Sequence, residues 1–106
     1  MLDRIAESHF HPLVGQRREL RLEDGQSLTV CVERVDAQPL AQRPGAPEGA
    51  RTPFRVDLVG IDPTPLLDGP CAMELPELGW VEGIRIQRVT PWTADPHTPC
   101  FQMVFG

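Results

Sequence analysis

The sequence predicts an all-β fold: a single small antiparallel β-barrel, roll or sandwich of six to seven strands, with one short N-terminal helix. Three observations lead to this prediction. Short runs of alternating apolar and polar residues recur along the chain, an Asp-Gly turn separates the first two runs, and no longer segment repeats its apolar residues with helical periodicity. The length of 106 residues suits one domain, residues 1–106, with one hydrophobic core.

The alternating runs are the predicted strands, because a period of two places every second side chain on the same face of a sheet. They cover residues 20–22, 28–32, 54–58, 71–75, 84–86 and 101–105. Asp24-Gly25 separates the first two runs and accepts the positive φ angles of a tight hairpin, so we expect these runs to pair antiparallel. The predicted core consists of Phe10, Leu20, Leu22, Leu28, Val30, Val32, Phe54, Val56, Leu58, Met73, Ile84, Ile86, Phe101, Met103 and Phe105.

The first part of the chain is expected to form a short helix that begins at residue 3 or 6 and reaches Phe10, with Pro12 and Gly15 ending it. Phe10 carries a core-type side chain and is predicted to close one end of the sheet. His9 and His11 flank it and are expected to face solvent, so replacing both with glutamine should leave stability almost unchanged.

A metal site would require the two ends of the chain to meet. His9-x-His11 and His97-x-x-Cys100 are both acceptable halves of a zinc site, which takes about four ligands. Each pair is common by chance. We therefore predict no bound metal and no other cofactor, and leave open whether the four residues come together.

The sequence contains no catalytic motif, so the chain is not expected to be an enzyme. It has no glycine-rich phosphate loop between a strand and a helix, no GxSxG and no HExxH. Asp57, Glu74 and Glu82 are predicted to lie on the polar faces of strands, whereas acid–base catalysis needs a carboxylate in a dry pocket. The cysteines are Cys31, Cys71 and Cys100. Their odd number and wide spacing predict reduced thiols, mostly buried and unreactive.

Two irregular stretches interrupt the strands. Residues 36–53 contain four prolines and two glycines, which predicts a mobile loop between two strands. Residues 90–100 form the second stretch and hold the candidate interaction residues, Trp92 and His97. Trp92 either anchors a partner or folds over one end of the sheet. Trp80 is expected in the core or at its rim.

The charge distribution excludes several classes of partner. The net charge is −5, and acidic residues are interspersed with arginines, so the sequence shows no run of the basic residues that nucleic-acid binding needs. No apolar stretch approaches the roughly 20 residues of a membrane span, so no membrane partner is expected. The N-terminus lacks the basic and apolar regions of a signal peptide. We therefore expect a cytoplasmic location, unless the chain is carried into a secreted assembly.

A series of turn and core positions extends along nearly the whole chain: Phe10, Val14-Gly15, Asp24-Gly25, residues 54–60, residues 67–69, Leu78-Gly79, residues 84–86 and residues 101–105. In these positions the chain resembles an uncharacterised bacterial family of similar length, a domain of unknown function. It departs from that family at Arg18, where an aromatic residue is usual, and at Cys71, where a tyrosine is usual. The family is often encoded near proteins with phage-tail-collar-like domains, so the resemblance implies a role in a fibre or tail-like assembly.

The predicted function is that of a non-enzymatic structural or assembly accessory protein that acts through protein–protein contacts. The expected partner is a tail-collar or fibre-type protein, or another copy of the chain. The alternative is a small-ligand-binding β-barrel module, because a half-closed barrel can hold an apolar ligand at its mouth. No cluster of polar residues in the sequence indicates a particular ligand.

Overall fold

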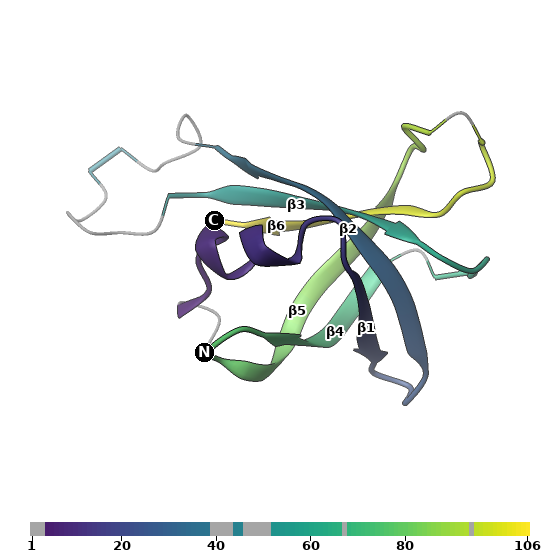
Figure 1. The fold of residues 1–106 in the computed structure, drawn as a ribbon, viewed down its shortest axis with the longest axis horizontal. Helices are drawn as coiled ribbons and strands as arrows, with labels where there is room; N and C mark the ends of the chain where they lie inside the picture. Colours follow the sequence, from purple (N-terminus) through teal and green to yellow (C-terminus); the bar gives the residue numbers. More distant parts are fainter. Residues whose placement is uncertain (1–3, 39–43, 46–51, 67, 94) are drawn as a thin grey trace.

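In the computed structural model, which describes residues 4–38, 44–45, 52–66, 68–93 and 95–106, six antiparallel strands form a closed barrel (Figure 1). The all-β prediction and its strand number are confirmed. The strands are β1 (Arg17–Leu22), β2 (Ser27–Ala37), β3 (Phe54–Gly60), β4 (Asp68–Leu75), β5 (Gly79–Val89) and β6 (Cys100–Phe105). Around the barrel they follow the order β1-β2-β3-β6-β5-β4.

The hairpin predicted around Asp24-Gly25 joins β1 to β2. Gly25 has a φ of 87°, which a residue with a Cβ rarely adopts. The Asp24 side chain accepts the Gln26 N–H at 2.9 Å and so closes the turn. This turn sets a register in which Leu20 lies opposite Leu28, and both side chains are buried in the core.

Strand β2 is longer than the sequence predicts. It continues to Ala37, because Glu33 forms a β-bulge where the register against β3 shifts between Val32 and Arg34. The extra residue moves the alternation by one position, so Arg34 remains exposed while Val35 packs against the core. The prediction that an irregular loop begins at residue 36 is therefore wrong, because residues 36 and 37 still belong to β2.

Most of the predicted loop, residues 36–53, lies outside the described residues. Its described ends are held together, because the Gln38 N–H donates to the Pro53 carbonyl at 2.6 Å. The pairing of β2 with β3 thus extends one residue beyond the last residue of β2.

Two 3₁₀ turns, η2 (Glu7–His9) and η3 (His11–Leu13), replace the single short helix that was expected to end at Phe10. Pro12 lies inside η3 and does not end the helical segment. Proline fits there because the N–H that it lacks has no partner in a first helical turn. No helix among the described residues is long and apolar enough to cross a membrane.

The hydrogen-bonded pairing between β5 and β6 is short, and the 3₁₀ turns lie where these two strands no longer pair. β5 pairs with β4 along most of its length but with β6 only through residues 87–89. The two strands therefore diverge toward the end of β6, and η2 and η3 lie beside that end (Figure 1).

Phe10, between the two turns, closes this end of the barrel as predicted. It is fully buried, and its ring centroid lies 5.9 Å from that of Phe54 and 5.6 Å from that of Phe105. Phe54 begins β3 and Phe105 ends β6, and their rings stack at 4.7 Å. The three rings thus join the N-terminal segment to two strands that lie far apart in the sequence.

The buried core agrees with the predicted core except at Leu22. This residue ends β1 and is half-buried against the core, whereas every other predicted core residue is at most 6% exposed. The structure adds buried residues outside the predicted set: Ile5, Leu13, Cys71, Leu75, Val81 and Cys100. Several of these lie in the N-terminal turns or at strand ends, where alternation is short or absent.

Gly60, the last residue of β3, approaches Pro99 closely. Its N–H donates to the Pro99 carbonyl at 2.8 Å, and a Cβ on Gly60 would lie 2.7 Å from Pro99 Cγ. Replacing Gly60 with alanine is expected to lower the free energy of unfolding by about 1–3 kcal/mol, because the rigid proline ring cannot move aside. Gly106→Ala is the control, since a Cβ there meets no atom within 4 Å. Equal losses in urea unfolding for the two variants would contradict the prediction.

Candidate functional site

The predicted interaction residues, Trp92 and His97, lie in the connection between β5 and β6. Trp92 is 45% exposed, and His97 is exposed as well. Asp95 holds this connection: its Oδ1 accepts the His97 N–H at 2.8 Å, and its carbonyl accepts the Thr98 N–H at 3.2 Å. These two hydrogen bonds fix the turn that carries His97, whereas Trp92 lies outside them. The role of both side chains in binding a partner stays a prediction.

The four residues of the possible zinc site lie in two separate places. His9 and His11 flank Phe10, beside the end of β6, whereas Cys100 begins β6 and His97 precedes it (Figure 1). A strand of this length spans roughly 17 Å. Among the described residues, no group of three or more His, Cys, Asp or Glu side chains could hold a metal ion.

The expectation that both N-terminal histidines face solvent is correct for His11 and wrong for His9. His11 is exposed, and its Nε2 lies 3.5 Å from a carboxylate oxygen of Glu7. His9 is half-buried, and its Nδ1 accepts the Ala6 N–H at 2.9 Å. That bond satisfies a backbone donor at the start of η2. Replacing His9 with glutamine should therefore cost some stability, whereas the same change at His11 should cost almost none.

The cysteine thiols are packed side chains. All three are free; Cys71 and Cys100 are buried and Cys31 is half-buried. Burial raises the pKa of the Cys71 thiol from 9.0 to about 11. Since the thiolate is the nucleophile, a thiol with this pKa is unreactive at neutral pH.

The raised pKa of Cys71 predicts a loss of stability in alkaline solution. In the unfolded chain the thiol loses its proton near pH 9, whereas in the folded chain it keeps it until about pH 11. Between these values the unfolded state binds fewer protons, so stability falls as the pH rises, by about 2–3 kcal/mol in total. The chain has no lysine and no tyrosine, so few other groups titrate in this range. Urea unfolding from pH 8 to 11 measures the slope, and Cys71→Ala should reduce it; an unchanged slope would contradict the assignment.

The prediction that Asp57 faces water is wrong, although it does lie on the outer face of β3. It is 2% exposed, because Arg34 and Arg55 cover it. Arg34 donates to Asp57 Oδ2 from Nε and Nη2 at 3.1 and 2.9 Å, and Arg55 Nε lies 3.2 Å from Oδ1. Asp36 completes the cluster, at 3.1 Å from Arg34 and 2.8 Å from Arg55. The hydrogen bond to Asp57 and the charge of Asp36 raise the pKa of Arg34. The charges balance within this cluster, which identifies it as structural.

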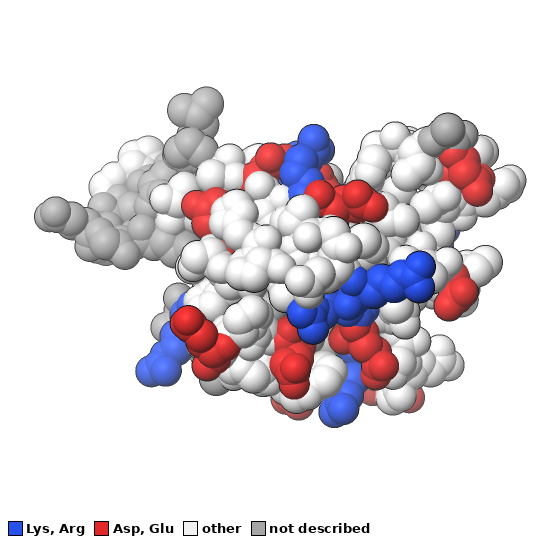
Figure 2. Space-filling model, in the orientation of Figure 1, with Lys and Arg blue, Asp and Glu red and all other residues white. Residues whose placement is uncertain are grey.

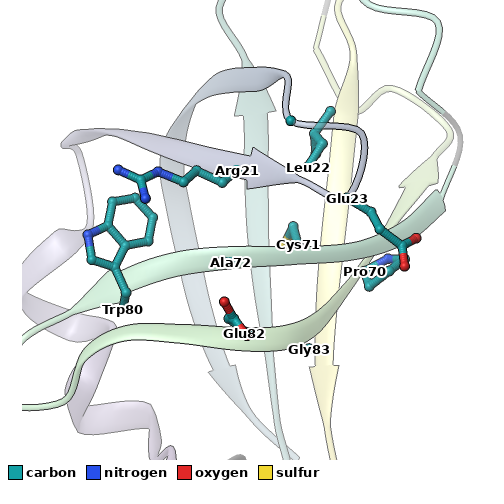
Figure 3. A pocket seen from close by; sticks show the side chains of 10 residues that line it. Arg21, Leu22, Glu23, Pro70, Cys71, Ala72, Trp80, Glu82 and Gly83 are labelled. Carbon is teal, nitrogen blue, oxygen red and sulfur yellow. The ribbon is translucent and has the colours of Figure 1, made fainter.

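A groove of about 510 Å³ follows the outer face of β1, β4 and β5 (Figure 3). Arg21 and Glu23 form the wall on the β1 side, and Trp80 and Glu82 form the wall on β5. The strand between them, β4, provides the floor, where Ala72 pairs with Arg21. The groove exists because a methyl side chain lies between two rows of long ones.

A β-bulge in β5 shapes the wall opposite Arg21. The register of β4 against β5 shifts between Cys71 and Met73, so that Glu82 and Gly83 together lie opposite Ala72. Gly83 has a φ of 77°, a conformation that glycine adopts without strain. In Figure 3 the Glu82 carboxylate points from this bulge toward β4 and the groove.

Trp80 was expected in the core or at its rim, and this expectation is wrong: its side chain lies on the outer face of β5 and is 39% exposed. The Arg21 guanidinium carbon lies 4.1 Å from the centroid of the Trp80 ring, well within the range of a cation–π contact. Within the described part of the chain, neither Arg21 nor the carboxylates of Glu23 and Glu82 form an ion pair. The groove thus combines an aromatic wall with charged groups that form no ion pair with any described residue.

Sequence reasoning missed this groove, because its residues come from three strands that no local pattern brings together. Of the residues that form its walls and floor, only Trp80 and Glu82 were singled out from the sequence, each for a different reason. The one available signal was Gly83, since a glycine inside a strand often marks a bulge.

Comparisons with known proteins bear on the family of the chain. Neither a curated protein nor a solved structure matches it. The sequence profile of one family matches residues 5–105, a range that includes both 3₁₀ turns and all six strands. The chain therefore belongs to DUF6916, a family defined as a domain of unknown function.

Proposed function

We propose that this chain is a bacterial structural or assembly accessory protein that acts through protein–protein contacts and performs no catalysis. The observation that carries the proposal is the contrast between a filled barrel and an aromatic outer surface. Phe10, Phe54 and Phe101 are fully buried inside, whereas Trp80 and Trp92 are each at least 39% exposed outside. Half-exposed tryptophans are frequent anchors of protein interfaces, because they combine a large apolar area with one polar donor.

The partner in this proposal is a tail-collar or fibre-type protein, or a second copy of the chain. The resemblance to a family encoded near tail-collar-like proteins supports the first choice. The surface supports a protein partner in general, because acidic and arginine side chains are mixed on the face shown in Figure 2. Such a mixture suits the polar rim of a protein interface better than a nucleic-acid backbone. Trp92 and His97, both exposed in the connection between β5 and β6, are the proposed contact residues.

Co-expression with the tail-collar-like protein encoded nearest to the gene tests the proposal. The two chains should co-elute in size-exclusion chromatography, and Trp92→Ala should weaken the complex by about tenfold or more. Val104→Ala is a matched control, because Val104 is an exposed apolar residue at 64% on a different part of the barrel. Repeated recovery of a lone monomer would count against the proposal.

A small-ligand-binding module is the second candidate, and the groove is the observation that favours it. Its volume of about 510 Å³ falls within the range of small-molecule pockets. However, the groove lies on the outer face of the sheet, whereas ligand-binding barrels hold their ligands inside. A thermal-shift screen against metabolites separates the candidates, since a ligand that binds the folded state raises the melting temperature. A flat response across a broad library would eliminate the small-ligand function.

A further inference from the structure

The groove between β1 and β5 already contains one guanidinium group, that of Arg21. Arg21 extends along β1, and the Trp80 side chain reaches over β4 from β5 to meet it, with the guanidinium carbon 4.1 Å from the ring centroid (Figure 3). Arg21 forms no ion pair with a described residue, so its attraction to the ring is what places it there. An exposed contact of this kind is weak, and a better-placed cation can displace it.

The carboxylates of the groove have the opposite charge and no cationic partner among the described residues. Glu82 follows Trp80 by two positions on β5, and its carboxylate points toward the groove (Figure 3). Glu23 lies at the far end, two positions after Arg21. Within the groove the acidic groups therefore outnumber the basic one, and the whole chain carries a net charge of −5. An aromatic face beside carboxylates is the combination that recognises guanidinium and ammonium groups.

We propose that the groove binds an arginine side chain presented by an extended segment of a partner protein, with the guanidinium on Trp80 and Glu82 and with Arg21 displaced. This inference rests on the proposed function, in which the chain acts through protein contacts, and it names the chemistry of the partner. The groove suits an extended segment because it follows the strands and has the shallow floor that Ala72 provides. Side chains that point the same way in an extended peptide recur about every 7 Å, and Glu23 lies beyond Arg21 along the groove, in the turn that follows β1. A second basic residue two positions away would therefore reach Glu23.

The probe is a five-residue peptide of glycine and serine with arginine at its second and fourth positions, capped at both ends. Its matched control carries citrulline, which has the same shape without the charge. The chain contains two tryptophans, so its ¹H–¹⁵N NMR spectrum has two indole signals, and Trp92→Phe assigns them. The Trp80 signal should shift on titration with the arginine peptide, with a dissociation constant on the order of 1 mM for so small a ligand. The citrulline peptide should bind at least about tenfold more weakly.

Four variants identify the contacts. Trp80→Ala should weaken binding about tenfold, and Glu82→Gln about threefold. Ala72→Leu should also weaken it about tenfold, because it fills the floor while keeping every charged and aromatic group. Arg21→Gln should tighten binding about threefold, since the internal guanidinium no longer competes. Ala72→Leu and Arg21→Gln keep the ring in place, so the proposal is tested even if Trp80→Ala fails to fold.

Several outcomes would overturn the inference. The Trp80 signal does not move, or the citrulline peptide binds as well as the arginine peptide, or Arg21→Gln weakens binding. Spermidine is a further probe: if it binds as tightly as the peptide, the groove takes small cations and not a protein segment. A tail-collar-like protein that binds the chain without moving the Trp80 signal would leave the proposed function intact and overturn only this inference. Conversely, peptide binding without a collar complex would overturn only the choice of partner.

Discussion

Replacing Phe10 with alanine is expected to lower the free energy of unfolding by about 3–5 kcal/mol. Phe10 has no exposed surface, and its ring contacts those of Phe54 and Phe105 at the end of the barrel where β5 and β6 diverge. The substitution removes buried area and leaves a cavity between the N-terminal turns and the two strands. Since a domain of this size has a total stability of roughly 5–15 kcal/mol, the urea midpoint should fall markedly.

Two variants control for this result. Phe10→Leu keeps much of the volume and should cost clearly less than the alanine variant. His11→Gln, in the adjacent turn, should change stability by less than about 0.5 kcal/mol, because its side chain is exposed. If Phe10→Ala cost no more than His11→Gln, the N-terminal turns would not be the closure of the barrel.

The part of the fold that sequence could predict was the part that local chemistry determines. The alternation in residues 28–32 and 54–58 follows directly from one face packing on a core, and each run lies within an observed strand. The Asp24-Gly25 turn was predictable for the same reason, because the required φ at Gly25 selects the residue. Phe10 was predicted as a core residue from its side chain and from its place in the pattern of the family that the chain resembles.

The bulges were not predictable, because they interrupt the pattern on which strand prediction depends. Beyond Val32, the residues Glu33 and Arg34 are both polar, so alternation ends and the strand was predicted to stop. In the barrel, β3 pairs with the continuing strand and tolerates the extra residue. The register that decides this comes from a partner strand across the loop, and no window of local sequence contains it.

The candidate site was harder still, because an outward position in a strand says nothing about what lies beside it. Arg21 and Trp80 are on strands separated by β4, and only the barrel topology places one over the other. Asp57 was rightly placed on the outer face of β3 but wrongly expected in water. Period-two alternation identifies the face, whereas burial on that face depends on the neighbouring strands.

A second large effect is expected at Asp57. Asp57→Asn should lower the free energy of unfolding by about 2–3 kcal/mol. Asp57 is 2% exposed; its Oδ2 accepts hydrogen bonds from Arg34, and its Oδ1 lies 3.2 Å from Arg55 Nε in an ion pair. The substitution therefore leaves two guanidinium groups facing an uncharged amide. Removing one partner from a fully buried ion pair lowers the free energy of unfolding by more than these 2–3 kcal/mol, by about 3–5 kcal/mol. The loss is smaller here because Arg34 remains largely in water, with its side chain 62% exposed.

Asp36 provides the matched control, because it contacts the same two arginines from a more exposed position. Its side chain is 36% exposed, so Asp36→Asn should cost no more than about 1 kcal/mol and should cost less still in 1 M salt. The loss from Asp57→Asn should persist in salt, since a buried pair is screened much less than an exposed one. Urea unfolding at low and high salt measures both variants. If the two substitutions cost the same and respond to salt alike, Asp57 is an ordinary surface charge. If only Asp57→Asn still lowers the free energy of unfolding in 1 M salt, the Asp57 carboxylate is a buried charge. The two arginines then cover it on the outer face of β3.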